Sequence, residues 1–211
     1  MKIGIIGATG RVGQAMVAAA LAKGHEVTAL VRNQAKAEKL FGSTVSLVVK
    51  DALTLDRVDF DGLDAVVDAF ASPQAFQHLD LATRLITMFR KTEKPYLLFV
   101  LGAGSLQLPS GERLVKQLEK TAAGAPWVKT PQQQLHEYQY LQWIQDVAWT
   151  AVSPQANLID GAPSDYRLGT DAVMTAPSGK SEVSVGNLAT AAIAELEAKT
   201  HLRQRFTVVN A

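Results

Sequence analysis

The sequence predicts an α/β fold with a doubly wound, mostly parallel sheet and helices on both faces. Short apolar, β-branched runs alternate along the chain with stretches of helical period. The run 96–101 is almost continuously apolar, as expected for a central strand that is covered on both faces. Because parallel strands need crossover helices between them, this alternation favours a parallel sheet.

The elements follow in order. Residues 2–6 form an apolar run that ends at a glycine, and the next stretch places Val12, Met16 and Ala19 on one helical face. Gly24 stands where a left-handed helix end is expected, and Asn33 is a predicted N-cap. The predicted strands are 2–6, 25–31, 45–49, 65–69, 96–101, 149–152 and 206–209. The predicted helices are 10–23, 33–40, 73–91, 112–122, 132–145 and one through 188–196.

The chain of 211 residues is long enough for one generous domain. Residues 154–185 are rich in Pro, Gly, Ser and Asp and carry weak strand signals. We therefore expect a single domain, 1–211, in which 154–185 form a small irregular lobe over the carboxyl edge of the sheet, on the substrate side.

Composition excludes several classes of function. Lys and Arg number 21 against 20 Asp and Glu, so no basic excess indicates a nucleic-acid or membrane-surface partner. The chain has no cysteine, which removes disulfides and thiolate chemistry. No run approaches the roughly 20 apolar residues that span a bilayer, and the first run is too short for a signal peptide. These observations predict a cytoplasmic protein that acts on a small molecule; they say nothing about its oligomeric state.

The stretch GATGRVG, residues 7–13, links the first strand to the first helix. A glycine here can simply turn the chain, but three glycines at this spacing have separable tasks. Gly7 makes the turn, Gly10 lets a pyrophosphate approach the backbone, and Gly13 lets the helix pack closely on the strand. The helix directs its free N–H groups at the phosphates. The context of strand, turn and helix favours a dinucleotide cradle that includes Thr9, Arg11 and Val12 over a bare turn.

The end of the second strand distinguishes between the two nicotinamide cofactors. A site selective for NAD places an acidic residue there to hold the ribose hydroxyl groups. This chain has Arg32 instead, and Arg11 in the glycine turn could hold the other side of a 2′-phosphate. The alternative for Arg32 is a solvated residue at a helix start. The charges favour NADP(H), with NAD(H) as the second choice.

Together, GATGRVG, ALVRN at 29–33, DAL at 51–53, VLGAGSL at 100–106 and WTAVSPQANLIDG at 149–161 resemble the atypical short-chain dehydrogenase/reductase group. Within this Rossmann-like group, the chain is most similar to the NADH-flavin reductase and NmrA-like proteins. The resemblance implies that Asp51 and Ala52 lie beside the adenine. It also implies that Ala69, Phe70 and Ala71 border the ribose and nicotinamide, and that the segment from Leu101 and Gly102 to Ser105 reaches the active centre.

The catalytic pair of most short-chain dehydrogenases, a Tyr with a Lys four residues later, is missing. The residues four positions after the four tyrosines are Val100, Gln142, Ile144 and Thr170. Without that acid, carbonyl reduction and sugar-nucleotide epimerisation are disfavoured. A flavin or quinone acceptor spreads the added charge over a conjugated ring, so positioning alone can suffice. The same absence also fits a redox sensor that binds NADP(H) and performs no chemistry. The flavin, in this interpretation, is a substrate and is not tightly bound.

Few other polar residues qualify as site candidates. Ser105 is the one candidate catalytic group, as a contact to substrate or nicotinamide, although its glycine-rich surroundings also fit a flexible loop. Gln155 and Asn157 are further candidates for the same cleft. The scattered histidines predict no metal site, and we expect His78 and His136 on helix surfaces. The acidic residues between 56 and 68 suggest a solvated segment, and the three tryptophans suggest packing in the core or lobe.

Overall fold

A computed structural model describes all 211 residues. The strands are β1 (Lys2–Ile6), β2 (Glu26–Val31), β3 (Ser46–Val49), β4 (Ala65–Asp68), β5 (Thr92–Val100), β6 (Val147–Ser153), β7 (Asn157–Ile159), β8 (Tyr166–Gly169), β9 (Glu182–Ser184) and β10 (Arg205–Asn210). The α-helices are α1 (Arg11–Ala22), α2 (Gln34–Phe41), α3 (Gln77–Phe89), α4 (Leu114–Thr121), α5 (Lys129–Gln142) and α6 (Val185–Ala198). Short 3₁₀ turns are η1 (Ala52–Thr54), η2 (Arg57–Phe60), η3 (Ala103–Ser105) and η4 (Pro126–Val128).

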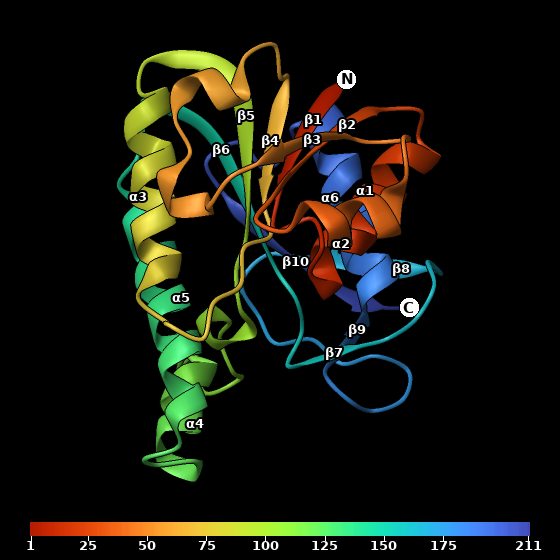
Figure 1. Cartoon of the computed structure of the whole chain (residues 1–211). Coiled ribbons are helices and arrows are strands. Elements are labelled where there is room, and N and C mark those ends of the chain that lie inside the picture. The colour runs from red at the N-terminus through yellow and green to blue at the C-terminus, as the bar shows by residue number, and fades with distance from the viewer.

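The main sheet has eight strands in the order β3-β2-β1-β4-β5-β6-β10-β8 (Figure 1). All neighbours are parallel except β8, which runs antiparallel to β10 at the edge. The chain order reverses between β1 and β4, and a crevice opens outside the carboxyl ends of the strands at such a point. The predicted Rossmann-like architecture is confirmed.

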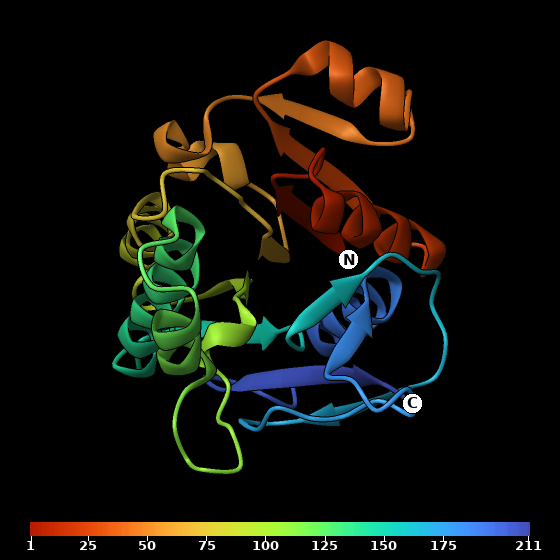
Figure 2. The same cartoon turned by 90° about the horizontal axis from the view of Figure 1, so that it is seen from below.

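Helices cover both faces of this sheet, as Figure 2 shows from below. Helices α1 and α6 pack together on one face, over a core that includes Ile3, Ile5 and Phe206. Helices α3 and α5 pack on the other face, over Ile6, Leu97 and Trp149. No helix combines the length and apolar character needed to cross a membrane.

The predicted elements all exist, with shifts at their ends. Two shifts reach four residues: β5 begins at Thr92 instead of 96, and α3 begins at Gln77 instead of 73. The Ser72 hydroxyl accepts a hydrogen bond from the Gln74 N–H at 3.1 Å and donates to the Gln77 side chain at 2.5 Å. Such local side-chain bonds compete with helix formation. The resulting loop passes over the carboxyl edge of the sheet.

Residues 154–185, for which an irregular lobe is predicted, contain three short strands. Strands β7 and β9 pair with each other in a small parallel sheet, and β8 joins the main sheet. The segment therefore contributes both a separate pair and an edge strand.

Candidate functional site

Each glycine of the turn between β1 and α1 is required for a different reason. Gly7 has a φ of +73°, and a Cβ atom there would lie 2.6 Å from the carbonyl oxygen of Ala69. A Cβ atom on Gly13 would lie 2.2 Å from the carbonyl oxygen of Gly7. A Cβ atom on Gly10 would meet only that same oxygen, at 3.2 Å. Gly7 and Gly13 thus serve packing, whereas Gly10 leaves its side open for a ligand.

The N-terminus of α1 is free to bind an anion. Its N-cap is Gly10, no side chain caps the first turn, and no acidic residue lies within that turn. The first N–H groups of a helix need external partners, and the helix dipole favours a negatively charged one. This geometry fits a dinucleotide pyrophosphate.

A cavity of about 280 Å³ extends from this turn over the end of β2. Its wall includes the predicted Gly7, Thr9, Gly10, Arg32 and Ala52. It also includes Lys36 and Lys50, which the sequence analysis missed. Lys36 lies in the first turn of α2, three residues after the N-cap Asn33. This spacing from a predicted N-cap at the end of β2 could have indicated from the sequence that Lys36 lies near the cleft. We call this cavity the nucleotide half of the cleft.

The cations of the nucleotide half differ in their partners. Lys50 is engaged by Asp59 at 2.7 Å and by Asp56 at 3.3 Å. Arg32 lies 3.9 Å from the Asp51 carboxylate and is largely exposed, and Lys36 forms no ion pair. Arg32 and Lys36 are therefore the cations available to an additional phosphate. Asp51 itself caps the turn at Ala52 by accepting a hydrogen bond from the Leu53 N–H.

Arg11 does not lie beside Arg32 as expected. Its guanidinium donates to the Asp160 carboxylate at 2.8 Å and to the Leu158 carbonyl at 3.0 Å. It belongs to the wall of a second cavity, because the segment around β7 passes in front of the glycine turn and supplies its partners. The expected pairing of Arg11 with Arg32 is therefore wrong, and the side chain that accompanies Arg32 in the first cavity is Lys36.

The second cavity has a volume of about 480 Å³, and we call it the acceptor half after the hydride acceptor that the sequence predicts. It shares Gly10, Ala69, Phe70 and Ala71 with the nucleotide half, so the two form one cleft. The predicted Arg11, Val12, Leu101 and Gly102 line it as well. Its other lining residues come from segments far apart in the sequence: Ser72, Pro73, His78, Val100, Thr130, Gln134, Pro154, Leu158 and Leu188.

His78 is buried in this cavity wall, and its predicted place on a helix surface is wrong. His78 is 6 % exposed, and Phe70 packs edge-on against its ring, with 5.7 Å between the two ring centres. Burial lowers the pKa of His78, although a hydrogen bond with the Ser72 backbone opposes the shift. Its Nε2 atom has no partner in the protein. The ring is therefore neutral at pH 7. His136, in contrast, is exposed as expected.

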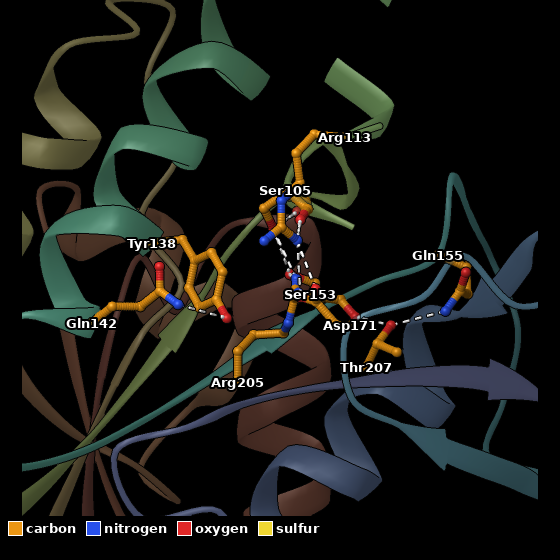
Figure 3. Close-up of polar contacts among 10 residues, drawn as sticks. Ser105, Arg113, Tyr138, Gln142, Ser153, Gln155, Asp171, Arg205 and Thr207 are labelled. Atoms are coloured by element: carbon orange, nitrogen blue, oxygen red, sulfur yellow. Dashed lines mark hydrogen bonds and ion pairs between the residues drawn. The ribbon is translucent and has the colours of Figure 1, made fainter. Parts of the chain in front are cut away.

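Ser105 lies away from the cleft, within a buried polar cluster (Figure 3). Its hydroxyl donates to the Gly102 carbonyl at 3.1 Å and accepts from Arg205 at 2.9 Å. Arg205 also bonds Ser153 and Asp171, and its guanidinium lies 4.6 Å from the centre of the Tyr138 ring. The predicted catalytic Ser105 therefore does not line the cleft; it lies beneath Gly102 and bonds its carbonyl oxygen.

Two buried carboxyl groups lie on the α3–α5 face. Asp68, at the end of β4, accepts a hydrogen bond from the Phe70 N–H at 3.0 Å. It is only 7 % exposed, so its predicted place in a solvated segment is wrong. Burial raises the pKa of Asp68 to about 7. Burial, and then the nearby charge of Asp68, raise the pKa of Glu137 on α5 well above its usual value. This pair holds protons at a pH where surface carboxyl groups are ionised.

Other expectations change in the same way. Gln155 is buried and bonds Thr207 and Ser181 instead of lining the cleft, and Asn157 bonds the Ser181 carbonyl. Trp149 packs in the core, but Trp127 and Trp143 are 55 % and 80 % exposed. No group of three or more His, Asp or Glu side chains is arranged to hold a metal ion.

Comparison with known proteins agrees with this geometry. The uncharacterised protein YwnB of Bacillus subtilis is 35 % identical over the whole chain and 99 % of its own length. A crystal structure from Lactobacillus casei matches over all of both chains with 38 % identity and a TM-score of 0.94. A candidate NADH-flavin reductase from Streptococcus pneumoniae also matches over all of both chains, with 29 % identity and a TM-score of 0.87. The model of the NAD(P)H-binding family matches residues 7–199, and the chain belongs to this family.

Proposed function

We propose that the protein is an NADP(H)-dependent reductase that passes hydride to a free flavin or a quinone-like ring. The observation that carries the proposal is the continuous cleft. A nucleotide half with a glycine cradle opens into an acceptor half of about 480 Å³ that offers no Tyr–Lys pair. Such a cavity is large enough for a second ring beside the nicotinamide.

Arg32 and Lys36 support the choice of NADP(H) over NAD(H). Both line the nucleotide half; Lys36 forms no ion pair, and the only carboxylate near Arg32 is that of Asp51, at 3.9 Å. A guanidinium matches the geometry of a phosphate, and a second cation nearby strengthens the attraction. No acidic side chain takes the place of Arg32 at the end of β2 to favour the unmodified ribose.

A bound NADPH supplies hydride, and the chain contributes binding, orientation and exclusion of water. The turn at Gly10 holds the pyrophosphate through backbone N–H groups. The walls from Val12, Leu101, Leu158 and Leu188 give the acceptor half a mostly apolar surface that limits water. Because His78 is neutral there, the wall presents no strong acid, and this suits a conjugated acceptor that stabilises its own negative charge.

The test is NADPH consumption with FMN, riboflavin and a soluble naphthoquinone in turn. We expect turnover that depends on the acceptor and is lost in Gly10→Ala, whose methyl group would block the phosphate cradle. NADPH binding without turnover of any acceptor would contradict the reductase.

That second outcome would favour a redox sensor. One contact supports it: Arg11 links the glycine turn to Asp160 in the 154–185 segment, so a bound nucleotide's charge can act on that segment. A sensor needs different affinities for NADP⁺ and NADPH, which titration of both forms measures.

A further inference from the structure

Gln134 places a free carboxamide in the acceptor half. It lies on α5, lines the cavity, and forms no side-chain hydrogen bond within the protein, whereas its neighbour Gln132 on the same helix bonds Glu119 at 2.8 Å. Polar groups in a largely apolar pocket fix the orientation and identity of a ligand. The amide is therefore available to a bound molecule.

Gly102 makes room for this amide. A Cβ atom on Gly102 would lie 2.1 Å from Oε1 and 3.0 Å from Cδ of Gln134. The three atoms nearest to that position all belong to the Gln134 amide, and Gly102 has a φ of −95°, which any residue adopts. The glycine is thus needed for the Gln134 side chain and not for the backbone. In addition, the Gly102 N–H donates no hydrogen bond in the protein.

The three free groups form a set that matches one kind of ligand edge. The Gly102 N–H is a donor, Gln134 Oε1 is an acceptor and Gln134 Nε2 is a donor. Their complement is an edge with a carbonyl, an N–H and a second carbonyl, which is a cyclic imide. The pyrimidine ring of a flavin presents this edge at N3–H, whereas a quinone offers only carbonyl oxygens and leaves Oε1 without a donor.

The position of Gln134 favours the acceptor over the cofactor as its ligand. Helix α5 packs with α3 on one face of the sheet, and α1, whose N-terminus forms the phosphate cradle, packs with α6 on the other. Gln134 and Thr130 thus form a wall that enters the cleft from the face opposite the nucleotide.

We propose that Gln134, held against Gly102, selects a flavin as the hydride acceptor by recognising its cyclic imide edge. This inference rests on the proposed reductase function and narrows it from two acceptor classes to one.

The experiment compares lumiflavin with 3-methyllumiflavin, in which a methyl group replaces the N3 hydrogen. Binding to the NADP⁺-loaded protein is measured by quenching of flavin fluorescence. A hydrogen-bond acceptor that loses its donor in the complex weakens binding, so we expect the methylated flavin to bind about tenfold or more weakly to the unmodified protein. Gln134→Leu should bring the two dissociation constants within about twofold of each other.

Two variants complete the design. Gly102→Ala should displace the Gln134 amide and reduce the discrimination between the two flavins, as Gln134→Leu does. Because Gly102→Ala keeps the glutamine, it tests the position of the amide separately from the loss of the side chain. Gln139→Leu, on the exposed side of the same helix, should keep the full discrimination. Equal affinity of the unmodified protein for both flavins overturns the proposal. So does a Gln134→Leu variant that loses affinity for NADP⁺ while it keeps the discrimination, because Gln134 then serves the cofactor's carboxamide.

The inference and the reductase can fail separately. Turnover of the naphthoquinone with no discrimination between the flavins leaves a quinone reductase and removes the role of Gln134. Discrimination between the flavins with no turnover of either keeps the recognition by Gln134 and removes the reductase.

Discussion

The two halves of the cleft are built in different ways. The nucleotide half consists mainly of backbone and cations from residues 7–10, 30–36 and 50–52, each at the end of a strand and close in sequence to its neighbours. The acceptor half takes side chains from α3, α5, the segment before β7, and α6. The nucleotide half therefore follows from local chain geometry, whereas the acceptor half follows from how distant helices pack.

We expect the largest effect in the glycine turn, where two substitutions distinguish the packing role of Gly13 from the ligand-binding role of Gly10. Gly13→Ala places a methyl group 2.2 Å from the Gly7 carbonyl oxygen, so we expect a loss of about 1–3 kcal/mol in unfolding free energy together with loss of NADPH binding. Gly10→Ala, at 3.2 Å, should retain most of its stability and still lose NADPH. Urea unfolding and fluorescence titration measure the two effects. Equal stability losses would contradict the division of tasks.

The second prediction concerns the buried polar cluster of Ser105, Asp171 and Arg205, which lies beneath Gly102. Asp171 accepts from both Arg113 and Arg205, and the Arg205 side chain is fully buried. Burial lowers the pKa of Arg205 to about 10. Asp171→Asn leaves that cation without its carboxylate, and because Asp171 is itself partly exposed, we expect a loss of about 2 kcal/mol in unfolding free energy.

The Asp171→Asn variant should weaken flavin binding more than NADPH binding, because the cluster lies behind Gly102 rather than behind Gly10. Asp146→Asn, which breaks an exposed pair with Arg90, is the matched control with little expected change. An equal loss of affinity for both ligands would mean that the two halves are not independently supported.

The buried carboxyl group Asp68 predicts a dependence of stability on pH. Its pKa is about 7 in the folded protein against 3.8 in the unfolded chain, so the folded state holds the extra proton between these values. The contribution of Asp68 to the free energy of unfolding is fully present below about pH 4. It is lost as the pH rises towards 7, by up to about 1.4 kcal/mol per pH unit.

Asp68→Asn should remove this contribution and make the protein relatively more stable at pH 8, while the raised pKa of Glu137 leaves a smaller slope of the same sign. Urea unfolding at pH 5, 6.5 and 8 measures both slopes. An unchanged slope in the variant would show that Asp68 is ionised throughout.

The smallest effect concerns the nucleotide half alone. Arg32→Asp should weaken NADPH about tenfold more than NADH, because it removes a phosphate contact and adds a like charge. Lys36→Glu should act in the same direction, whereas Lys39→Glu, exposed on the same helix and outside the cleft, should not. Equal losses for both cofactors would remove the 2′-phosphate role of Arg32.

The sequence alone determined the sheet, its crossover helices and the phosphate cradle. Strand and helix periods act over a few residues, and the glycine turn is a local requirement of backbone space, so Gly7, Gly10 and Gly13 could be assigned without tertiary information. The position of Arg32 at the end of a strand was predictable for the same reason.

The residues that line the acceptor half could be identified only from the tertiary structure. Arg11 bonds Asp160, Ser105 is buried under Arg205, and His78 and Gln134 line the cavity, because the position of each side chain depends on how separate elements of the fold pack together. Gln134 is indistinguishable in sequence from Gln132 and Gln133, and it differs only because the missing side chain of Gly102 leaves space for its amide. Local backbone geometry is encoded in neighbouring residues, whereas the position of a side chain within a cleft depends on the packing of the whole chain.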